Sequence, residues 1–450
     1  MPLVRLLRAT VTSLLAMTLL TGVAPMANAE PDCRDAGPNQ RFVVLFNPGT
    51  PHSEAAAESE SHCGDIAAYY RQIGVGIVDS PDPAFAERLG PDRAYSAERR
   101  ARADRLGPQR APAEVRGSNP WNLQRVRADQ AHAITRGSRD VHVGVLDSGV
   151  DAAHPELAAA VDTQRSANCL TPEHPQLAER PVGEGHGTHV AGIVGAADDG
   201  RGVTGVAPET GLASIRVVDP EGYAHPEYAV CGFMWAAEHD IDVANTSFLV
   251  ESAQLGCGST GSPVPREAVR RAVRYATAHD VLTVAAAGNE RIDLTAVPRR
   301  EKPVCEAVPA GLDGVVSVSA IGRNSVKSGY SSYGLGAVDI AAPGGEPGAD
   351  ECVRSTVPGG YGSSCGTSMA APHVSGVAAL IKTQHPEAGP AELRRRLLGG
   401  ADPIGCPGTY DLNRDGAQDA RCRGDPADNG FYGHGLVDAR KAVADPPGAD

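Results

Sequence analysis

Short apolar runs alternate with longer amphipathic stretches along most of the chain, from about residue 121 onward. Strands that are apolar throughout belong to parallel sheets, because helices cover both faces of such sheets. We therefore predict an α/β domain over residues 117–450, with a mainly parallel sheet between two layers of helices. The predicted strands are residues 141–146, 213–218, 242–248, 281–287, 315–321 and 338–341, and the predicted helices are residues 186–197, 228–239, 264–279, 367–384 and 391–398.

A smaller segment, residues 30–116, precedes this domain. Residues 41–46 and 74–78 have the pattern of strands, and residues 54–70 read as largely helical. Proline and glycine residues then mark an exposed linker over residues 110–120. We expect the segment to be a small α+β unit that does not share the core of the larger domain.

The first 29 residues have the three parts of a secretory signal peptide. Arg5 and Arg8 are followed by an apolar run over residues 9–23, and then by the small residues Ala27, Asn28 and Ala29. The apolar run is short for a membrane span, which needs about 20 apolar residues. We expect cleavage after Ala29 and an extracellular, monomeric mature protein that no later segment holds at a membrane.

Charge and cysteine content narrow the function further. The formal net charge is −14 and the acidic residues are dispersed, so the chain lacks the basic footprint of a nucleic-acid-binding protein. The ten cysteines include no C-x-x-C metal spacing, and in an exported protein they should form disulfides. Connectivity stays open, and the simplest pairings are Cys33–Cys63, Cys352–Cys365 and Cys406–Cys422.

Four polar residues lie where a predicted strand ends or a predicted helix begins. Asp147 and Asn289 each follow a strand, and His186 and Ser368 each begin a helix. A serine hydroxyl becomes a nucleophile when a base removes its proton, and that base needs a third group to orient it. A side-chain amide such as that of Asn289 can donate to the oxyanion of a tetrahedral intermediate, together with the backbone N–H of Ser368.

The blocks around these residues resemble the subtilisin-like serine peptidases, over about residues 121–443. Four blocks occur in the family's order, and the joint match is much more specific than any one of them. They are VGVLDSGVDAAHPEL (residues 143–157), GHGTHVAG (185–192), AAAGNE (285–290) and GTSMAAPHVSG (366–376).

The resemblance implies a three-layer subtilisin-like fold and an endopeptidase that cleaves proteins or peptides without a cofactor. It makes Asp147 the residue that orients the base, His186 the general base and then acid, Ser368 the nucleophile, and Asn289 the oxyanion donor. It also implies substrate-binding roles for Ser247, Phe248, Leu249, Ala286 and Gly288.

One departure from the family leaves the specificity open. Relatives have Ser-Leu-Gly-Gly where this chain has Ser247, Phe248, Leu249 and Val250. The two larger side chains should crowd the edge on which an extended substrate pairs as an added strand. Glu290, at the rim, would favour basic residues.

The resemblance further implies that residues 30–116 are a propeptide, which assists folding and acts as an intramolecular inhibitor until it is removed. The alternative is a separate binding domain that stays attached. Two other functions remain to be distinguished. One is a catalytically silent binding protein on this fold, and the other is an esterase that uses Ser364 in Gly362-Ser-Ser-Cys-Gly, which we reject because loop residues should precede it.

Three further motifs have competing interpretations. His189 follows His186 without the glutamate of a zinc motif, so a structural role is favoured. Asn245 fits a glycosylation sequon but lies on a predicted buried strand. Asp411, Asn413, Asp415 and Asp419 begin like a calcium loop, yet Cys422 stands where the bidentate glutamate belongs. Weak binding of a structural Ca²⁺ and an Asx-rich turn are both open for this loop.

Overall fold

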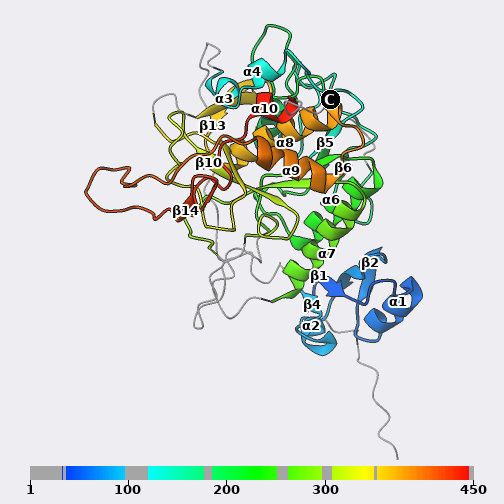
Figure 1. The fold of residues 1–450 in the computed structure, drawn as a ribbon. Helices are drawn as coiled ribbons and strands as arrows, with labels where there is room; N and C mark the ends of the chain where they lie inside the picture. The colour runs from blue at the N-terminus through cyan, green and yellow to red at the C-terminus, as the bar shows by residue number, and fades with distance from the viewer. Residues whose placement is uncertain are drawn as a thin grey trace, which may run out of the picture.

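A computed structural model describes residues 33, 37–96, 120–176, 185–250, 262–295, 307–348 and 352–444 of the protein. The predicted signal peptide and nearly all of the predicted linker lie outside these residues. Figure 1 shows a large α/β domain and, beside it, a small N-terminal unit drawn in blue. We call residues 37–96 the N-terminal unit.

A seven-stranded sheet lies at the centre of the large domain, in the order β11-β10-β9-β8-β5-β7-β6. Every neighbouring pair in it is parallel, so the predicted α/β architecture is confirmed. The chain adds strands on both sides of β5, which makes the neighbourhood of β5 the topological switch point where ligands usually bind. The strands are β5 (His142–Asp147), β6 (Ala167–Asn168), β7 (Gly211–Arg216), β8 (Val243–Thr246), β9 (Leu282–Ala286), β10 (Val316–Ile321) and β11 (Ile340–Pro343).

Helices cover both faces of this sheet. On one face α5 and α8 pack against the strands, and on the other face α6 and α7 do so. Alternate side chains of β5 pack on opposite faces of the sheet, since Val143 and Val145 lie in one apolar cluster and Leu146 lies in the other. The helices are α3 (Trp121–Arg125), α4 (Ala128–Ala131), α5 (Gly185–Gly195), α6 (Pro226–Glu238), α7 (Val264–Ala278), α8 (Thr367–Gln384), α9 (Pro390–Gly400) and α10 (Ala439–Val443).

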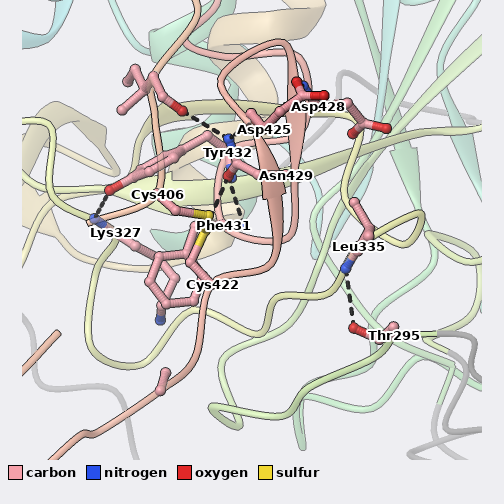
Figure 2. Close-up of a disulfide and its surroundings, with 12 residues drawn as sticks. Thr295, Lys327, Leu335, Cys406, Cys422, Asp425, Asp428, Asn429, Phe431 and Tyr432 are labelled. Atoms are coloured by element: carbon pink, nitrogen blue, oxygen red, sulfur yellow. Dashed lines mark hydrogen bonds between the residues drawn. A yellow bond between two sulfur atoms is a disulfide. The ribbon is translucent and has the colours of Figure 1, made fainter. Parts of the chain in front are cut away.

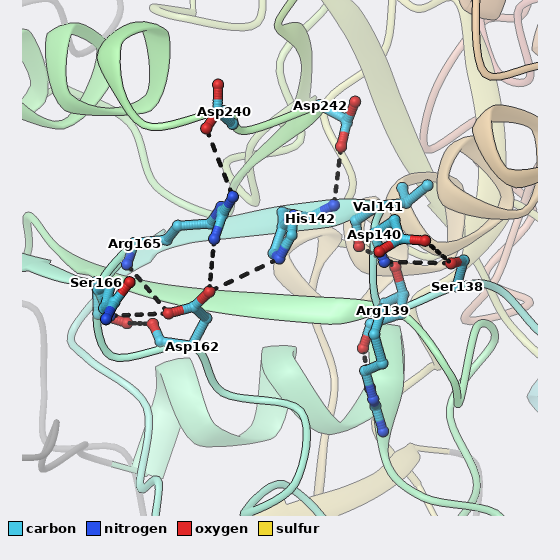
Figure 3. Close-up of polar contacts among 12 residues, drawn as sticks. Ser138, Arg139, Asp140, Val141, His142, Asp162, Arg165, Ser166, Asp240 and Asp242 are labelled. Carbon is cyan, nitrogen blue, oxygen red and sulfur yellow. Dashed lines mark hydrogen bonds and ion pairs between the residues drawn. The ribbon is translucent and has the colours of Figure 1, made fainter.

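Polar contacts fix the amino ends of the central strands (Figure 3). The backbone N–H of His142, the first residue of β5, donates to Asp242 over 2.9 Å, directly before β8. Arg165 pairs with Asp162 at 2.7 Å and with Asp240 at 3.5 Å. Because β5 and β8 are tied at their amino ends, their carboxyl ends lie level at the opposite edge of the sheet.

The N-terminal unit contains a four-stranded sheet in the order β2-β3-β1-β4. The predicted strands over residues 41–46 and 74–78 are confirmed as β1 and β3. The elements are β1 (Gln40–Leu45), α1 (His52–Glu60), β2 (Asp65–Tyr70), β3 (Val75–Ser80), α2 (Phe85–Leu89) and β4 (Ala94–Tyr95).

Two predictions about this unit are wrong. The helix expected over residues 54–70 ends at Glu60, and Asp65–Tyr70 is instead a strand paired with β3. Tertiary pairing therefore overrides the helical composition of this stretch. The unit also shares a core with the large domain, because Val43 and Leu45 lie in the same apolar cluster as Phe233 of α6.

The residues before α8 form a hairpin, not the predicted loop. β12 (Val353–Val357) pairs antiparallel with β13 (Gly360–Ser364). The glycine-rich turn between the two strands made this stretch look like a loop in the sequence. β13 is nevertheless a strand, because the preceding strand β12 pairs with it. A second short hairpin, β14 (Gly424–Asp425) with β15 (Asp428–Asn429), lies near the C-terminal end.

Disulfides cross-link segments in both parts of the molecule. The three simplest pairings, Cys33–Cys63, Cys352–Cys365 and Cys406–Cys422, are confirmed. Cys169–Cys231, which ties the end of β6 to α6, is an additional bridge. Figure 2 shows Cys406–Cys422 beside Asn429, Phe431 and Tyr432. Cys257 and Cys305 lie outside the described residues.

Within the described residues, no helix is both long enough and apolar enough to cross a membrane.

Candidate active site

The carboxyl ends of three adjacent strands bring the predicted site together. Leu146 of β5 pairs with Thr246 of β8, and Thr246 pairs with Ala285 of β9. The next residue of each strand, Asp147, Ser247 and Ala286, therefore lies at the same level of the sheet edge. The parallel register alone produces this arrangement, at the switch point beside β5.

Asp147 and His186 form a close pair. Nδ1 of His186, near the start of α5, lies 2.7 Å from Oδ1 of Asp147. The same carboxylate oxygen accepts from the backbone N–H of Ser148 over 2.7 Å. Asp147 is 1% exposed, so little water screens its charge. Gly187 is needed beside them, because a Cβ there would lie 2.3 Å from the carbonyl oxygen of Gly149.

The electrostatics of this pair favour a protonated imidazole. Burial by itself lowers the pKa of His186, but the charge of Asp147 and its hydrogen bond outweigh that effect. The pKa of His186 is therefore raised above its ordinary value. A base whose charged form is stabilised accepts a proton more readily, which is the property that removal of a hydroxyl proton requires.

Ser368 is the second residue of α8 and is partly exposed. Its hydroxyl donates to the carbonyl oxygen of Ser247 over 3.1 Å, and the Ser247 hydroxyl donates back to the carbonyl oxygen of Ser368 over 3.0 Å. These reciprocal bonds fix the start of α8 against the end of β8. In this structure the hydroxyl proton thus points to Ser247, not to His186.

Asn289 lies directly after the turn that follows β9, and Thr367 orients it. The Asn289 Oδ1 atom accepts from the backbone N–H of Thr367 over 2.9 Å and from its hydroxyl over 3.0 Å. This arrangement leaves Nδ2 as the donor that is directed elsewhere. A Cβ on Gly366 would lie 3.6 Å from Nδ2 of Asn289 and 3.7 Å from the backbone nitrogen of Ser368. Both nitrogens thus border one small space beside Gly366.

The five predicted substrate-binding residues lie at or just beyond the carboxyl ends of β8 and β9. Ser247 and Ala286 are buried, whereas Phe248 and Leu249 are partly exposed and pack on the cluster beneath α6 and α7. Gly288 adopts a φ of +105°, which favours glycine.

Side chains already crowd the surface of Gly288. A Cβ on Gly288 would lie 3.3 Å from Cδ1 of Leu249 and 2.5 Å from Oε2 of Glu290. The Ser332 hydroxyl donates to the Glu290 carboxylate over 3.4 Å. The backbone N–H of Ser332 donates to the Gly288 carbonyl over 2.9 Å. Leu249 thus lies beside Gly288, whereas Val250, which was also expected to crowd this edge, is fully buried and its backbone N–H donates to the carbonyl of Val308 over 2.9 Å.

The surroundings of His189 and Asn245, whose motifs had competing interpretations, favour structural roles for both. His189 is buried, and a ring nitrogen donates to the carbonyl oxygen of Val353 over 3.1 Å. Burial lowers the pKa of His189 to about 3, so its ring is neutral. Asn245 is fully buried and bonds to Ser247 and Ser375, so its amide has hydrogen-bond partners inside the strand and a structural role.

The expectation of a loop before Ser364 is wrong, and the expectation that the neighbouring Cys365 forms a disulfide is confirmed. A strand does precede Ser364, contrary to the expected loop, but this strand is β13 of a two-stranded antiparallel hairpin and not part of the central sheet. The neighbouring Cys365 is bonded to Cys352, as expected for a structural position. Ser368, in contrast, bonds to Ser247 at the carboxyl edge of the parallel sheet.

The loop over residues 411–419 closes on itself. Asp411 accepts from the backbone N–H groups of Asp415 and Gly416, and Asp415 accepts from that of Ala417. Asp419 accepts from the backbone N–H of Leu412 over 2.7 Å, and Asn413 donates to Asp415 over 2.9 Å.

These contacts do not complete a calcium cage. Ca²⁺ takes six to eight oxygens, and Cys422, at the twelfth position, is bonded to Cys406. Among the described residues, no group of three or more His, Cys, Asp or Glu side chains could hold a metal ion. The geometry favours the Asx-rich turn.

Thr367 and Ser332 are the site residues that the sequence analysis did not single out. Thr367 lies inside the GTSMAAPHVSG block, so its position in that block was an available signal. Ser332 lies in Ser331-Ser332-Tyr333-Gly334, a weaker match to the family, but its contact with Glu290 joins residues 42 positions apart and leaves no local pattern.

Comparisons with known proteins agree with this geometry. A model of the subtilase family matches residues 138–435. M-protease of Shouchella clausii (strain KSM-K16) is 32% identical over 376 residues, which span 82% of this chain and 88% of that protein. Subtilisin BL of Lederbergia lenta is 34% identical over 294 residues, or 65% of this chain and 95% of that protein.

Solved structures are similar as well. The epidermin leader peptide processing serine protease EpiP of Staphylococcus aureus has a TM-score of 0.66 at 21% identity, covering 90% of this chain and 98% of that chain, and shows the shared fold. A protease of Pseudoalteromonas arctica PAMC 21717 has a TM-score of 0.54 at 28% identity, covering 74% of this chain and 99% of that chain. The chain belongs to the subtilase family, and it is a subtilisin-like serine protease with the three-layer α/β fold of that family.

Proposed function

We propose that this protein is a secreted serine endopeptidase that cleaves proteins or peptides through an acyl-enzyme. The observation that supports this most directly is the 2.7 Å contact between a buried Asp147 and His186, at the sheet edge where the partly exposed Ser368 bonds to Ser247. In this mechanism His186 takes the proton of the Ser368 hydroxyl as the serine oxygen attacks the substrate carbonyl. Asp147 orients the imidazole and stabilises its protonated form.

The proton then moves to the leaving amine. His186 donates it to the nitrogen of the cleaved bond, the C–N bond breaks, and an ester to Ser368 remains. Water attacks the ester with His186 again as base, and the hydroxyl of Ser368 is restored. Asn289 Nδ2 and the N–H of Ser368 donate to the oxyanion in both halves of the reaction, which fits the space they share beside Gly366.

Substrate binding must first redirect the Ser368 hydroxyl. In the absence of substrate this hydroxyl donates to the Ser247 carbonyl. Rotation of the Ser368 side chain turns its O–H toward His186, a change that catalytic hydrogen bonds commonly undergo as the Michaelis complex forms.

The side chains beside Gly288 suggest a substrate class. Leu249 and Glu290 occupy the space against which a large side chain before the cleaved bond would lie. We infer a preference for a short side chain, such as that of alanine or serine, at that position. A preference for a basic residue, drawn by Glu290, is the competing outcome.

We also propose that residues 30–116 are a propeptide and that residues 1–29 direct secretion. The N-terminal unit covers part of the large domain, which is consistent with an inhibitor that docks before it is removed. No cofactor enters the chemistry, which the residues of the chain complete by themselves.

Two measurements test this function. A fluorophosphonate should label the wild-type protein and Ser364→Ala but not Ser368→Ala, and a silent binding protein would show no labelling at all. Intact mass of the secreted wild type should lack residues 1–116 or nearly so, whereas Ser368→Ala should keep the propeptide. Labelling of Ser368→Ala that is lost in Ser364→Ala would support the esterase instead.

A further inference from the structure

The hairpin of β12 and β13 links the two helices that carry the proposed base and the proposed nucleophile. It is a separate two-stranded sheet and not part of the central one. β12 packs against α5, whose second residue is His186. β13 leads into α8, whose second residue is Ser368. The position of this hairpin therefore affects where both side chains lie.

Three hydrogen bonds fix β12 to α5. The hydroxyl of Ser355 donates to the carbonyl of His189, and the hydroxyl of Thr356 donates to the carbonyl of Thr188, each over 2.7 Å. In the opposite direction, a ring nitrogen of His189 donates to the carbonyl of Val353 over 3.1 Å. All five residues are buried, so water does not compete for these bonds. β12 thus fixes α5 within three residues of the proposed base.

The Cys352–Cys365 disulfide closes the open end of the hairpin. Val353 lies opposite Ser364 in the outermost pair, so the two cysteines are the next residue on either strand. A two-stranded hairpin on its own is only marginally stable in water. β12 is mostly buried, whereas β13 is mostly exposed or half-buried. The disulfide therefore ties the less buried strand, which leads to α8, to the strand that is fixed on α5.

We propose that the Cys352–Cys365 disulfide is a positioning element of this site, and that its reduction lowers kcat while the domain stays folded. The inference rests on the proposed function, because it concerns the relative placement of His186 and Ser368. Cys365 precedes Ser368 by only three positions. A misplacement of about 1 Å lowers an enzymatic rate by about 10²-fold. The protein thus reaches full activity only in oxidising surroundings, where such bridges persist.

The bridge is within reach of a small dithiol. Cys352 and Cys365 are both partly exposed, whereas Cys169 and Cys231 are at most 2% exposed. One thiolate of the reagent attacks a sulfur of the bridge, the S–S bond breaks, and a mixed disulfide and one cysteine thiolate result. The second thiolate of the reagent then displaces the other cysteine, and the reagent leaves as a cyclic disulfide. Two electrons pass to the protein, and each released thiolate takes a proton from water.

Cys406–Cys422 provides a matched control. Its cysteines are also partly exposed, and they are 16 positions apart, compared with 13 for Cys352–Cys365. The two bridges therefore constrain the unfolded chain to a similar degree. Cys406–Cys422 lies beside Asn429, near the C-terminal hairpin (Figure 2). Its loss leaves the β12–β13 hairpin closed.

The first test compares wild type with Cys352→Ser/Cys365→Ser and Cys406→Ser/Cys422→Ser, each expressed as the full chain. We expect both variants to keep the circular dichroism of the folded protein and to lose a similar amount of thermal stability. Only Cys352→Ser/Cys365→Ser should lose kcat on a fluorogenic peptide, by about 10- to 100-fold. Its KM should stay within about twofold, because the proposed substrate-binding residues follow the central strands and not the hairpin.

Reduction of the folded wild type is the second test, and it does not depend on the folding of a variant. Dithiothreitol should lower kcat of wild type and of Cys406→Ser/Cys422→Ser by the same factor, and oxidised glutathione should restore it. The kcat of Cys352→Ser/Cys365→Ser should not change. Iodoacetamide trapping and mass spectrometry should find Cys352 and Cys365 among the new thiols.

Three results would overturn the positioning role and leave the protease intact. They are a wild-type kcat in folded Cys352→Ser/Cys365→Ser, a decrease in kcat that only accompanies loss of the circular dichroism signal, and failure to trap Cys352 and Cys365 after reduction. Fluorophosphonate labelling of oxidised wild type separates this inference from the proposed function. Its absence would overturn the proposed function itself.

Discussion

The imidazole of His186 and the carboxylate of Asp147 meet at 2.7 Å in a part of the molecule where Asp147 is almost fully buried. This contact raises the pKa of His186, because the charge and hydrogen bond of Asp147 outweigh the opposing effect of burial. In the proposed mechanism His186 must be neutral to act as the base, so we expect activity to be lost as the pH falls through that raised pKa. We expect the acid limb of kcat/KM to lie above about pH 6.5, the ordinary value for histidine.

Asp147→Asn provides the control for that pH profile. The variant removes the negative charge, so the pKa of His186 should fall and the acid limb should move to lower pH. The imidazole also loses its orienting partner, and kcat should fall by about 10⁴. An acid limb that stays in place in Asp147→Asn would show that another group controls it.

Asn289→Ala tests the oxyanion donor. Thr367 directs Nδ2 of Asn289 toward the space beside Gly366, so the amide is preorganised for a developing charge. In subtilisin, a relative of this protein, loss of one such donor lowers kcat by about 10²–10³, and we carry this value over. KM should change little, because the bond strengthens mainly in the transition state. A rise in KM with an unchanged kcat would assign Asn289 to substrate binding only.

Leu249→Gly should make more room beside Gly288. Removing the side chain that lies 3.3 Å from the position of a Gly288 Cβ makes room for a large residue before the cleaved bond. We expect kcat/KM for peptides with leucine or phenylalanine there to rise about 10- to 200-fold, the range for a pocket that gains hydrophobic contacts. The value for alanine peptides should change by less than about threefold. Rates on a peptide library with each of the 20 residues at this position measure both effects.

A wild-type preference for arginine or lysine in that library would contradict the short-side-chain proposal. Glu290→Gln is the variant that would then identify the carboxylate as the cause. Its charge loss should remove a basic preference and leave a preference for short side chains unchanged.

Lys327 makes stability depend on pH. Its side chain is 1% exposed, and its ammonium donates to the carbonyls of Ser328 and Ser331 and lies about 5 Å from the ring centroids of Tyr333, Tyr410 and Phe431. Burial lowers the pKa of Lys327 to about 8, although the charge of Glu346 opposes this. Figure 2 shows its backbone N–H bonded to Tyr432 beside the Cys406–Cys422 bridge.

The sign of this effect follows from proton binding. Between about pH 8 and pH 10.5 the unfolded chain keeps a proton on Lys327 that the folded protein has released, so the free energy of unfolding rises with pH. The rise attributable to Lys327 should approach about 3 kcal/mol. Urea unfolding of Ser368→Ala at pH 7.5 and pH 10, with and without Lys327→Met, measures it. Equal pH dependence in the two proteins would contradict the lowered pKa.

Chelation tests the loop over residues 411–419. Its carboxylates already accept backbone N–H groups, and its twelfth position is a disulfide-bonded cysteine. We therefore expect EGTA to lower the thermal unfolding temperature of Ser368→Ala by less than about 1 °C. A larger decrease that calcium reverses, and that Asp411→Ala abolishes, would show that the loop holds an ion.

The sequence by itself determined the local parts of this protein. The runs 141–146 and 281–287 and the helix Thr367–Gln384 were recognisable because burial on both faces and helical periodicity leave a pattern within one segment. The blocks around Asp147, His186, Asn289 and Ser368 were recognisable for the same reason, since glycines and reactive side chains lie close together within each block.

Only the tertiary structure decided which of these segments meet. Asp65–Tyr70 is a strand because β3 pairs with it, and Val353–Val357 is a strand because β13 folds back on it, although neither partner is readable from the segment itself. The direction of the Ser368 hydroxyl and the crowding of Gly288 by Leu249 depend likewise on residues tens to hundreds of positions away. Contacts of this kind form between surfaces that exist only after folding, so no local pattern records them.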